Sequence, residues 1–261
     1  MNHDASLIRE DEGGVATLRL NRPLGLNTLN ESMMDALQRE LDLLAADSTV
    51  RSVVIAASGR AFCAGHDLHE MRANWRLSYY QSLFTRCSRL MQSIRSLPVP
   101  VIARVHGAAA AAGCQLVASC DLAIAADSAR FAVSGINVGL FCSTPAVALS
   151  RSISAKRAFD MLVTGRLIDA ATAVDWGLIN EAVPAADLDA AVLRKTQAIA
   201  AKSPAAIRYG KAMFHRQREM SVADAYECAA EVMARNMMEP ETRDGIDVFL
   251  DKGARPSDSS L

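Results

Sequence analysis

The groups most able to do chemistry in this chain are backbone amides that lie where the side chains are smallest. Seven of the nine positions from Gly107 to Gln115 are Gly or Ala, and the β-branched run from Val99 to Val105 precedes them. A strand that passes through such a stretch into a helix lets a ligand approach the backbone closely. The first amides of a helix are unpaired and carry the positive end of its dipole, so they suit a carbonyl oxygen that becomes negative during a reaction. Small residues also let a helix pack tightly, which is a purely structural explanation of the same run.

A second turn of small residues has the same setting. Ala64 and Gly65 follow the strand-like run from Val53 to Ala56. Two such turns, each after a buried strand, can supply two amides to one oxygen. The presence of both turns favours a binding or catalytic site over tight packing alone.

Four segments together resemble the crotonase (enoyl-CoA hydratase/isomerase) superfamily, and the resemblance covers nearly the whole chain. Each motif alone is weak, but the combination is specific. The segments are Asn21-Arg22-Pro23 with Leu26 to Asn30, Ala61 to Leu68, His106-Gly107 through Cys120-Asp121, and Phe159 to Pro184. The resemblance implies an α/β fold of the ClpP-like type. Its core is a spiral of ββα turns over residues 1–200, and a C-terminal helical region over residues 201–261 packs on neighbouring subunits.

In that family two backbone amides hold the thioester carbonyl of a CoA substrate and stabilise its enolate. The resemblance places these amides at His66 and Ala112, where the identity of the side chain matters little. One such donor is worth roughly 3–4 kcal/mol. The implied ligand is an acyl-CoA thioester, with CoA as part of the substrate and with no separate cofactor or metal.

The chain departs from the family's hydratases at the two positions that carry their acid and base. A hydratase has a glutamate after the Gly-Cys pair of the third motif, where this chain has Gln115, and its second glutamate maps to Gly135. Glutamine can orient a water but cannot take a proton near neutral pH. General acid–base help is typically worth about 10²–10⁴-fold. Hydration by the two-glutamate route is therefore expected to be very slow or absent, and Gln115 is the remaining catalytic candidate.

Cys142, Ser143 and Thr144 form a polar run where some isomerases and a dehalogenase of the family carry a carboxylate. This run can face the acyl group, or Ser143 or Thr144 can cap a helix whose first residue is Pro145. As a nucleophile, Cys142 would need a nearby cation to lower the pKa of its thiol. Four other side chains near the motifs have solvated or packing roles as the simpler explanation: His66, His69, His106 and Glu70.

The resemblance also assigns CoA contacts by position. The expected contacts with the nucleotide end are Arg22 and Leu24, and those along the pantetheine path are Ala64, Asp67, Leu68 and His69. The expected acyl pocket has Gly135, Cys142 and Ser143. A C-terminal Phe-x-x-Lys, here Phe249 and Lys252, is expected to reach the ligand of a neighbouring subunit. The implied partner besides the thioester is the chain itself, as a homotrimer or homohexamer.

Three classes of function stay open. The first is an enzyme of enolate chemistry on acyl-CoA, such as an isomerase, a decarboxylase or an atypical hydratase. The second is a CoA-thioester hydrolase that uses Cys142 or a water held by Gln115. The third is a non-catalytic acyl-CoA binder or scaffold. The run from Gly139 to Pro145, with the third motif, is closest to the subgroup called enoyl-CoA hydratase domain-containing, the third of that name.

The composition narrows the choice of partners and compartment. The 261-residue chain has a net charge of −1, which gives no general basic field for nucleic acid. It has no apolar run of the roughly 18 residues that a membrane span needs. Six cysteines show no paired metal-ligand spacing, and the N-terminal residues show no signal or transit segment. A reduced cytoplasmic setting is the expectation that follows.

Hydrophobic periodicity places the elements that must position these groups. Strands alternating with helices indicate a parallel sheet with crossover connections. From about residue 155 the strands are expected to cease. The expected strands are 15–20, 53–57, 101–105, 122–126 and 130–133, and the expected helices are 31–47 capped by Asn30, 79–96, 155–164, 170–177, 185–202, 204–218 and 221–238.

Overall fold

Between Ser52 and Ala132, successive strands of the chain alternate between two sheets. The structure is a computed structural model and describes residues 5–253, without the side chains of residues 252 and 253. It contains a six-stranded sheet in the order β1-β2-β3-β5-β7-β10 and a four-stranded sheet in the order β4-β6-β8-β9. In the larger sheet β1 (Leu7–Glu12) pairs antiparallel with β2 (Val15–Leu20), and the other neighbouring strands pair in parallel.

Three strand pairs follow one another, each with one strand in the larger sheet and the next in the smaller. They are β3 (Ser52–Ala57) with β4 (Ala61–Cys63), β5 (Val101–Val105) with β6 (Ala108–Ala110), and β7 (Leu122–Ala126) with β8 (Arg130–Ala132). Helices close each turn: α2 (Leu68–Ala73) and α3 (Leu77–Ser96), then α4 (Ala112–Ser119), then the 3₁₀ turn η2 (Ser134–Val138) and α5 (Ser143–Ser152). This arrangement confirms the expected spiral of ββα turns.

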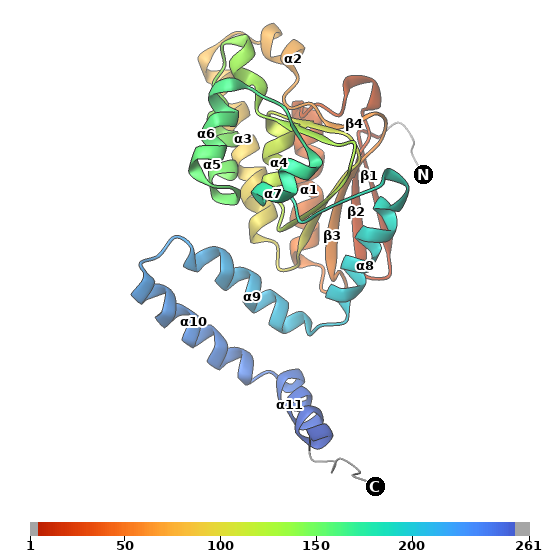
Figure 1. The fold of residues 1–261 in the computed structure, drawn as a ribbon, viewed down its shortest axis with the longest axis vertical. Coiled ribbons are helices and arrows are strands. Elements are labelled where there is room, and N and C mark those ends of the chain that lie inside the picture. Colours follow the sequence, from red (N-terminus) through yellow and green to blue (C-terminus); the bar gives the residue numbers. More distant parts are fainter. Residues whose placement is uncertain (1–4, 254–261) are drawn as a thin grey trace. The chain divides into compact units, whose positions relative to one another are not determined.

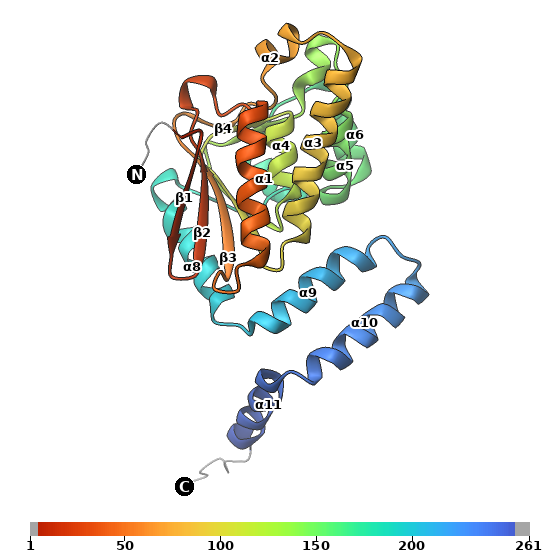
Figure 2. The same cartoon turned by 180° about the vertical axis from the view of Figure 1, so that it is seen from behind.

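Helices cover both faces of the larger sheet, which explains why its central strands are mostly apolar. All six residues of β3 are buried, as expected for a parallel strand covered on both sides. Helices α1 (Glu31–Ala46) and α3 lie side by side over one face (Figure 2). On the other face, Leu188, Ala191 and Val192 of α8 (Leu188–Ala200) pack on Val54 and Ile102.

Most of the longer predicted elements are confirmed within one to three residues at each end. Helix α1 has Asn30 as its N-cap, with the side-chain oxygen of Asn30 accepting from the Met33 N–H at 3.0 Å. The structure also has α6 (Ala155–Thr164) and α7 (Ala170–Trp176), and short 3₁₀ turns η1 (Pro23–Gly25) and η3 (Ala185–Asp187).

The expectation that strands cease near residue 155 is wrong. Strand β9 (Ile168–Asp169) pairs with β8, and β10 (Glu181–Val183) pairs with β7 at the edge of the larger sheet. These strands have two and three residues, which is too short for an alternating pattern to show.

The chain divides into two compact units between Ile199 and Ala200. The second unit consists of α9 (Pro204–Gln217), α10 (Val222–Met237) and α11 (Pro240–Gly253), with α9 and α10 running side by side in opposite directions (Figure 1). None of the helices within residues 5–253 has both the length and the apolar character that crossing a membrane requires.

Candidate functional site

The two turns of small residues touch each other at one end of the smaller sheet. Strands β4 and β6 pair in parallel, with Cys63 opposite Ala109, so both strands lead into their turns at the same edge. Gly65 has φ +98°, and a Cβ placed there would lie 2.9 Å from the Cβ of Ala111 and 3.3 Å from the nitrogen of Ala112. The second turn therefore needs glycine at residue 65, both for its backbone conformation and for this close approach.

Both turns carry backbone N–H groups that the fold leaves unpaired. Within the described residues, neither the His66 N–H nor the Ala112 N–H donates to a backbone oxygen. Ala112 is the first residue of α4, where the intrahelical acceptor is missing by geometry. Ala111 has φ +48°, a conformation that costs a non-glycine residue about 1–3 kcal/mol. Such strain is common at functional sites, and here it sets the direction in which α4 begins.

Gln115 lies in the first turn of α4 and is 4% exposed. Its Oε1 is 3.4 Å from Oγ1 of Thr144, which donates to it, and 4.0 Å from Sγ of Cys87 on α3. Thr144 also lines a pocket of about 440 Å³ together with Phe84 and Ser88 of α3. The side chain of Gln115 is therefore part of a polar contact between α3, α4 and α5, next to that pocket.

The proposed helix cap near Pro145 is wrong. Helix α5 begins at Ser143, and its N-cap residue is Cys142, which makes no side-chain capping bond. Pro145 is therefore the third helical residue rather than the first. Because the start of α5 does not need Thr144 as a cap, the hydroxyl of Thr144 is free to contact Gln115.

The loop between Gly135 and Cys142 has no room for a second carboxylate. A Cβ at Gly135 would lie 2.5 Å from the carbonyl oxygen of Leu140 and 2.8 Å from Sγ of Cys142. Leu140 N–H also donates to the carbonyl of Gly135 at 3.0 Å. Cys142 is buried, and this burial raises the pKa of its thiol, so the group stays protonated at neutral pH. Ser143 is exposed, with its hydroxyl 3.4 Å from the carbonyl of Phe141.

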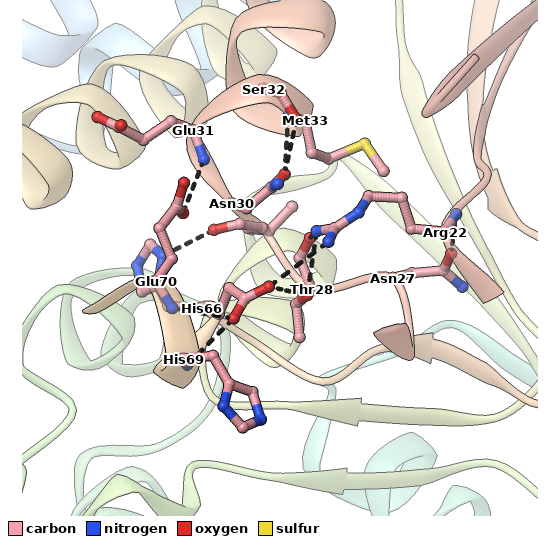
Figure 3. A network of polar contacts seen from close by, with 12 residues as sticks. Arg22, Asn27, Thr28, Asn30, Glu31, Ser32, Met33, His66, His69 and Glu70 are labelled. Atoms are coloured by element: carbon pink, nitrogen blue, oxygen red, sulfur yellow. Dashed lines mark hydrogen bonds and ion pairs between the residues drawn. The ribbon is translucent and has the colours of Figure 1, made fainter. Parts of the chain in front are cut away.

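A polar network joins the first and second motifs (Figure 3). Arg22 donates to the carbonyl oxygen of Thr28 at 3.2 Å, and its guanidinium lies 3.5 Å from the carboxylate of Asp67. Asp67 accepts from the Thr28 hydroxyl at 3.2 Å and caps α2 by accepting from the N–H groups of His69 and Glu70. The network fixes the chain directly after His66.

Two further polar residues hold the same region. Glu70 accepts from the N–H of Glu31 at 3.1 Å, so it caps α1 rather than lying on a solvated helix face. Asn27 is completely buried with φ +54°, and its amide donates to the carbonyls of Ser58 and Ala61 at 2.8 Å each. Asn27 belongs to the first motif, but its structural role was not predicted. The sequence feature that could have indicated this role is the residue type, since asparagine tolerates the left-handed conformation better than other non-glycine residues.

Asp67→Ala should destabilise the protein at neutral pH by about 1 kcal/mol, the usual worth of a helix N-cap. Desolvation raises the pKa of Asp67, but bonds from Glu70 N–H and the Thr28 hydroxyl, with Arg22, outweigh it and hold the pKa below its ordinary value of 3.8. A lowered pKa gives stability that is fully present above 3.8 and is lost as the pH falls through the lowered value. Urea denaturation between neutral and acid pH measures the difference.

The control for this experiment is Glu12→Ala, because Glu12 is an exposed carboxylate on β1. Its effect on the free energy of unfolding should be small at every pH. A difference between wild type and Asp67→Ala that does not shrink in acid would contradict the role given to the ionised carboxylate.

The two histidines of the motifs are held in the same way. Nδ1 of His66 is 3.2 Å from the carbonyl oxygen of Leu29, and Nε2 of His106 is 2.8 Å from that of Gly59. In each ring the other nitrogen is buried without a hydrogen-bond partner. Desolvation is the main cause that lowers the pKa of both imidazoles, so both rings are neutral at physiological pH.

The remaining predicted contact residues are spread over the surface. Leu24, Leu68 and His69 are exposed, and Ala64 N–H donates to the carbonyl of Leu26 at 3.1 Å. Phe249 is 76% exposed on α11, and the side chain of Lys252 lies outside the described residues. Their contacts with CoA stay a prediction. Among residues 5–253, no group of three His, Cys, Asp or Glu side chains could hold a metal ion.

Comparison with known proteins decides the family. A sequence profile described as enoyl-CoA hydratase/isomerase matches residues 10–257. The chain belongs to the enoyl-CoA hydratase/isomerase family. It is 40% identical to enoyl-CoA hydratase domain-containing protein 3, mitochondrial, of Xenopus laevis over 97% of this chain and 86% of that protein. The human protein of the same name is 41% identical over 92% of this chain and 79% of its own length.

A solved structure of this family shows the same fold. The crystal structure of an enoyl-CoA hydratase from Mycobacterium smegmatis has a TM-score of 0.94 and 54% identity, and it covers 97% of this chain and 98% of that chain. The fold class and the subgroup expected from the motifs are therefore confirmed. The expectation of a cytoplasmic setting is contradicted, because the related animal proteins are named mitochondrial. Cysteine spacing and the charge of the first residues do not fix a compartment.

Proposed function

We propose that this enoyl-CoA hydratase/isomerase family member binds acyl-CoA thioesters and stabilises their enolates with the N–H groups of His66 and Ala112. The observation that carries the proposal is the contact between the two turns, in which Gly65 packs against Ala111 and Ala112. Both N–H groups lack a backbone acceptor within the described residues. Preorganised donors at a developing negative charge are usually the largest electrostatic contribution to such a reaction.

The proposed chemistry is enolate chemistry other than two-glutamate hydration, such as isomerisation, decarboxylation or an atypical hydration. The resemblance to the hydratases puts their acid and base at positions 115 and 135, and these are Gln and Gly here. Gln115 is the side chain closest in sequence to the Ala112 amide on α4 that can bind a substrate atom. Because glutamine does not titrate, it can orient a substrate or a water but not carry the proton.

A thioester hydrolase is the second candidate, and the residues of the site support it less well than enolate chemistry. Cys142 is a poor nucleophile, since burial raises the pKa of its thiol. A hydrolase would instead have to use a water held by Gln115. A non-catalytic acyl-CoA binder is the third candidate, and it would use the same amide pair, because the strain at Ala111 fits a ligand clamp as well as an active site. A panel of saturated, enoyl and malonyl-type CoA thioesters, assayed for turnover and binding, separates these classes.

Ala112→Pro tests the proposed amide pair directly. Proline removes the N–H of the first helical residue at a position that helices accept. Acetoacetyl-CoA ionises readily to an enolate with its own ultraviolet absorbance, so the bound enolate can be followed. The variant should bind this enolate roughly 100-fold more weakly, while binding of CoA itself should change little.

Ala112→Gly is the matched control for this variant, because it alters the side chain and keeps the N–H. It should bind the enolate nearly as wild type does. Equal losses for the enolate and for CoA in a folded Ala112→Pro protein, judged by circular dichroism, would remove the amide pair from the proposal.

The protein is also proposed to act as a homotrimer or homohexamer, in which Phe249 and Lys252 reach the CoA of a neighbouring subunit. The second unit supports this proposal, because α10 has no buried residue although it carries Tyr226 and Met233. Large exposed apolar surfaces usually mark interaction sites. Sedimentation at micromolar concentration should give a trimer or a hexamer, and a stable monomer would leave Phe249 without a role at a neighbour's ligand.

A further inference from the structure

Nε2 of the His66 imidazole is a hydrogen-bond acceptor that has no donor within the described residues. Nδ1 of the same ring lies 3.2 Å from the carbonyl oxygen of Leu29. A carbonyl can only accept, so Nδ1 carries the hydrogen and Nε2 presents a lone pair. Nε2 is buried and has no hydrogen-bond partner in the described part of the chain. A buried unpaired polar atom of this kind calls for an explanation.

The position of the ring links the two turns to the pocket beside Gln115. The His66 ring packs edge-on against Phe84 of α3, with ring centroids 5.6 Å apart. Phe84 and Thr144 line one pocket, and Thr144 contacts Gln115. The imidazole also belongs to the residue whose own N–H is proposed to hold the thioester oxygen. A thioester oxygen held there would have its α-carbon two bonds away, next to the residue that carries the imidazole.

We propose that Nε2 of His66 is the base that removes a proton from the α-carbon of the bound acyl-CoA, an inference that rests on the proposed function. The α-C–H bond breaks, and its proton moves to Nε2. The electron pair forms the carbon–carbon double bond of the enolate, and the carbonyl pair moves onto the oxygen facing the N–H groups of His66 and Ala112. Return of the proton restores the neutral imidazole, so no oxidant or further reactant is needed.

The surroundings of the ring keep it in the form that this step needs. The imidazole contacts the carbonyl oxygen of Leu29 and the aromatic ring of Phe84. The titratable and charged groups on the neighbouring helices are the α2 cap Asp67, then His69, Glu70 and Arg72 of α2, and Tyr79, Tyr80, Arg86, Cys87, Arg89 and Arg95 of α3. Asp67 and Glu70 are engaged as helix caps, and the Tyr80 hydroxyl donates to the carbonyl of Met71. Burial therefore governs the imidazole, which stays neutral and ready to accept. Because Nε2 has no solvent contact, Phe84 must move when a substrate carbon reaches it, while the ring keeps its Nδ1 contact with Leu29.

Deuterium incorporation at the α-carbon of butyryl-CoA in D₂O tests this step, because a saturated thioester can exchange its α-proton without any hydration. Wild type should incorporate deuterium, detected by mass spectrometry. His66→Phe keeps the backbone N–H and the flat ring but loses the lone pair, so exchange should fall by about 100-fold or more. Enolate binding is measured in the same variant, and exchange should fall by a much larger factor than binding, because the variant loses the lone pair and the Nδ1 bond to Leu29 but keeps the N–H.

His106→Phe is the matched control, because His106 has the same arrangement of one bonded and one buried unpaired nitrogen. It should exchange like wild type. If His66→Phe does not fold, His66→Ala with added imidazole gives the second measurement, and imidazole should restore exchange. In wild type, exchange should weaken as the pH falls below the lowered pKa of His66 and the ring gains its proton.

The outcomes separate this inference from the proposed function. Undiminished exchange of the α-proton in His66→Phe overturns the assignment of His66 as the base. Tight, Ala112-dependent binding of the enolate by wild type without any exchange overturns the base and leaves the proposed function standing. Failure of wild type to bind the enolate more tightly than CoA overturns the proposed function and the base with it.

Discussion

Crotonyl-CoA should be hydrated by this protein several orders of magnitude more slowly than by a two-glutamate hydratase. Each missing proton-transfer group is worth roughly 10²–10⁴-fold, and Gln115 and Gly135 replace both. The measurement is kcat for loss of the absorbance of the enoyl thioester. A value within about tenfold of an ordinary hydratase, a barrier difference near 1.4 kcal/mol, would contradict this prediction.

The structure also says how far the activity can be restored. Gln115→Glu replaces an amide with a carboxyl of the same shape, so it should fold and should raise hydration at most modestly, since one carboxylate is still missing. Gly135→Glu should instead disturb the loop, because its Cβ would lie 2.5 Å from the oxygen of Leu140. Full restoration by the two substitutions together would show that the loop adapts more easily than its geometry indicates.

Gly113→Ala should destabilise the first unit by about 3 kcal/mol, at the upper end of the cost of overpacking. A Cβ at Gly113 would collide with the carbonyl group of Cys63, 2.8 Å from its carbon, and would lie 2.9 Å from the Cβ of Cys63. The obstacle is the backbone of β4, which cannot turn aside as a flexible side chain can. The substitution should therefore push α4 away from β4 and separate the two turns.

Urea denaturation followed by tryptophan fluorescence measures this effect, because Trp75 and Trp176 both lie in the first unit. Gly25→Ala is the matched control within that unit. A Cβ there meets only side-chain atoms, at 3.7 Å or more, so the free energy of unfolding should change by about 0.5 kcal/mol or less. If Gly113→Ala is as stable as the control, α4 is not held against β4 as tightly as described.

Most long elements of this fold could be predicted from the sequence, whereas β1, α11 and most of the three-residue strands were not among the expected elements. Helix α1 shows its cap and its apolar spacing plainly, and β3 and β5 are apolar apart from Ser52 and Arg104. Strands β4 and β6 have three residues each, and β6 consists only of alanine. No period can be measured over three residues, yet these two strands bring the turns together. The resemblance to a family supplied this pairing, which periodicity could not.

The candidate site was predictable where it depends on backbone position and less so where it depends on side-chain contacts. The turns at Gly65 and Ala112 stand out by composition alone. The contact of Thr144 with Gln115 crosses 29 residues of sequence, and the role of Glu70 as a cap for α1 crosses 39. Contacts of this kind depend on how helices pack, and no local pattern encodes them. The prediction that Pro145 is the first helical residue was wrong for a local reason, since proline is also accepted elsewhere in the first helical turn.

The close approach of Gly65 to Ala111 has a consequence for the natural history of this protein. With 2.9 Å between the Cβ of Ala111 and the place where a Cβ would stand at residue 65, the two positions cannot enlarge independently. Residue 65 is also confined to glycine by its φ of +98°, so over evolutionary time residue 111 should stay Ala or Gly, although it lies 46 residues away in sequence. A collection of orthologous genes can reveal this limit without any assay of the protein.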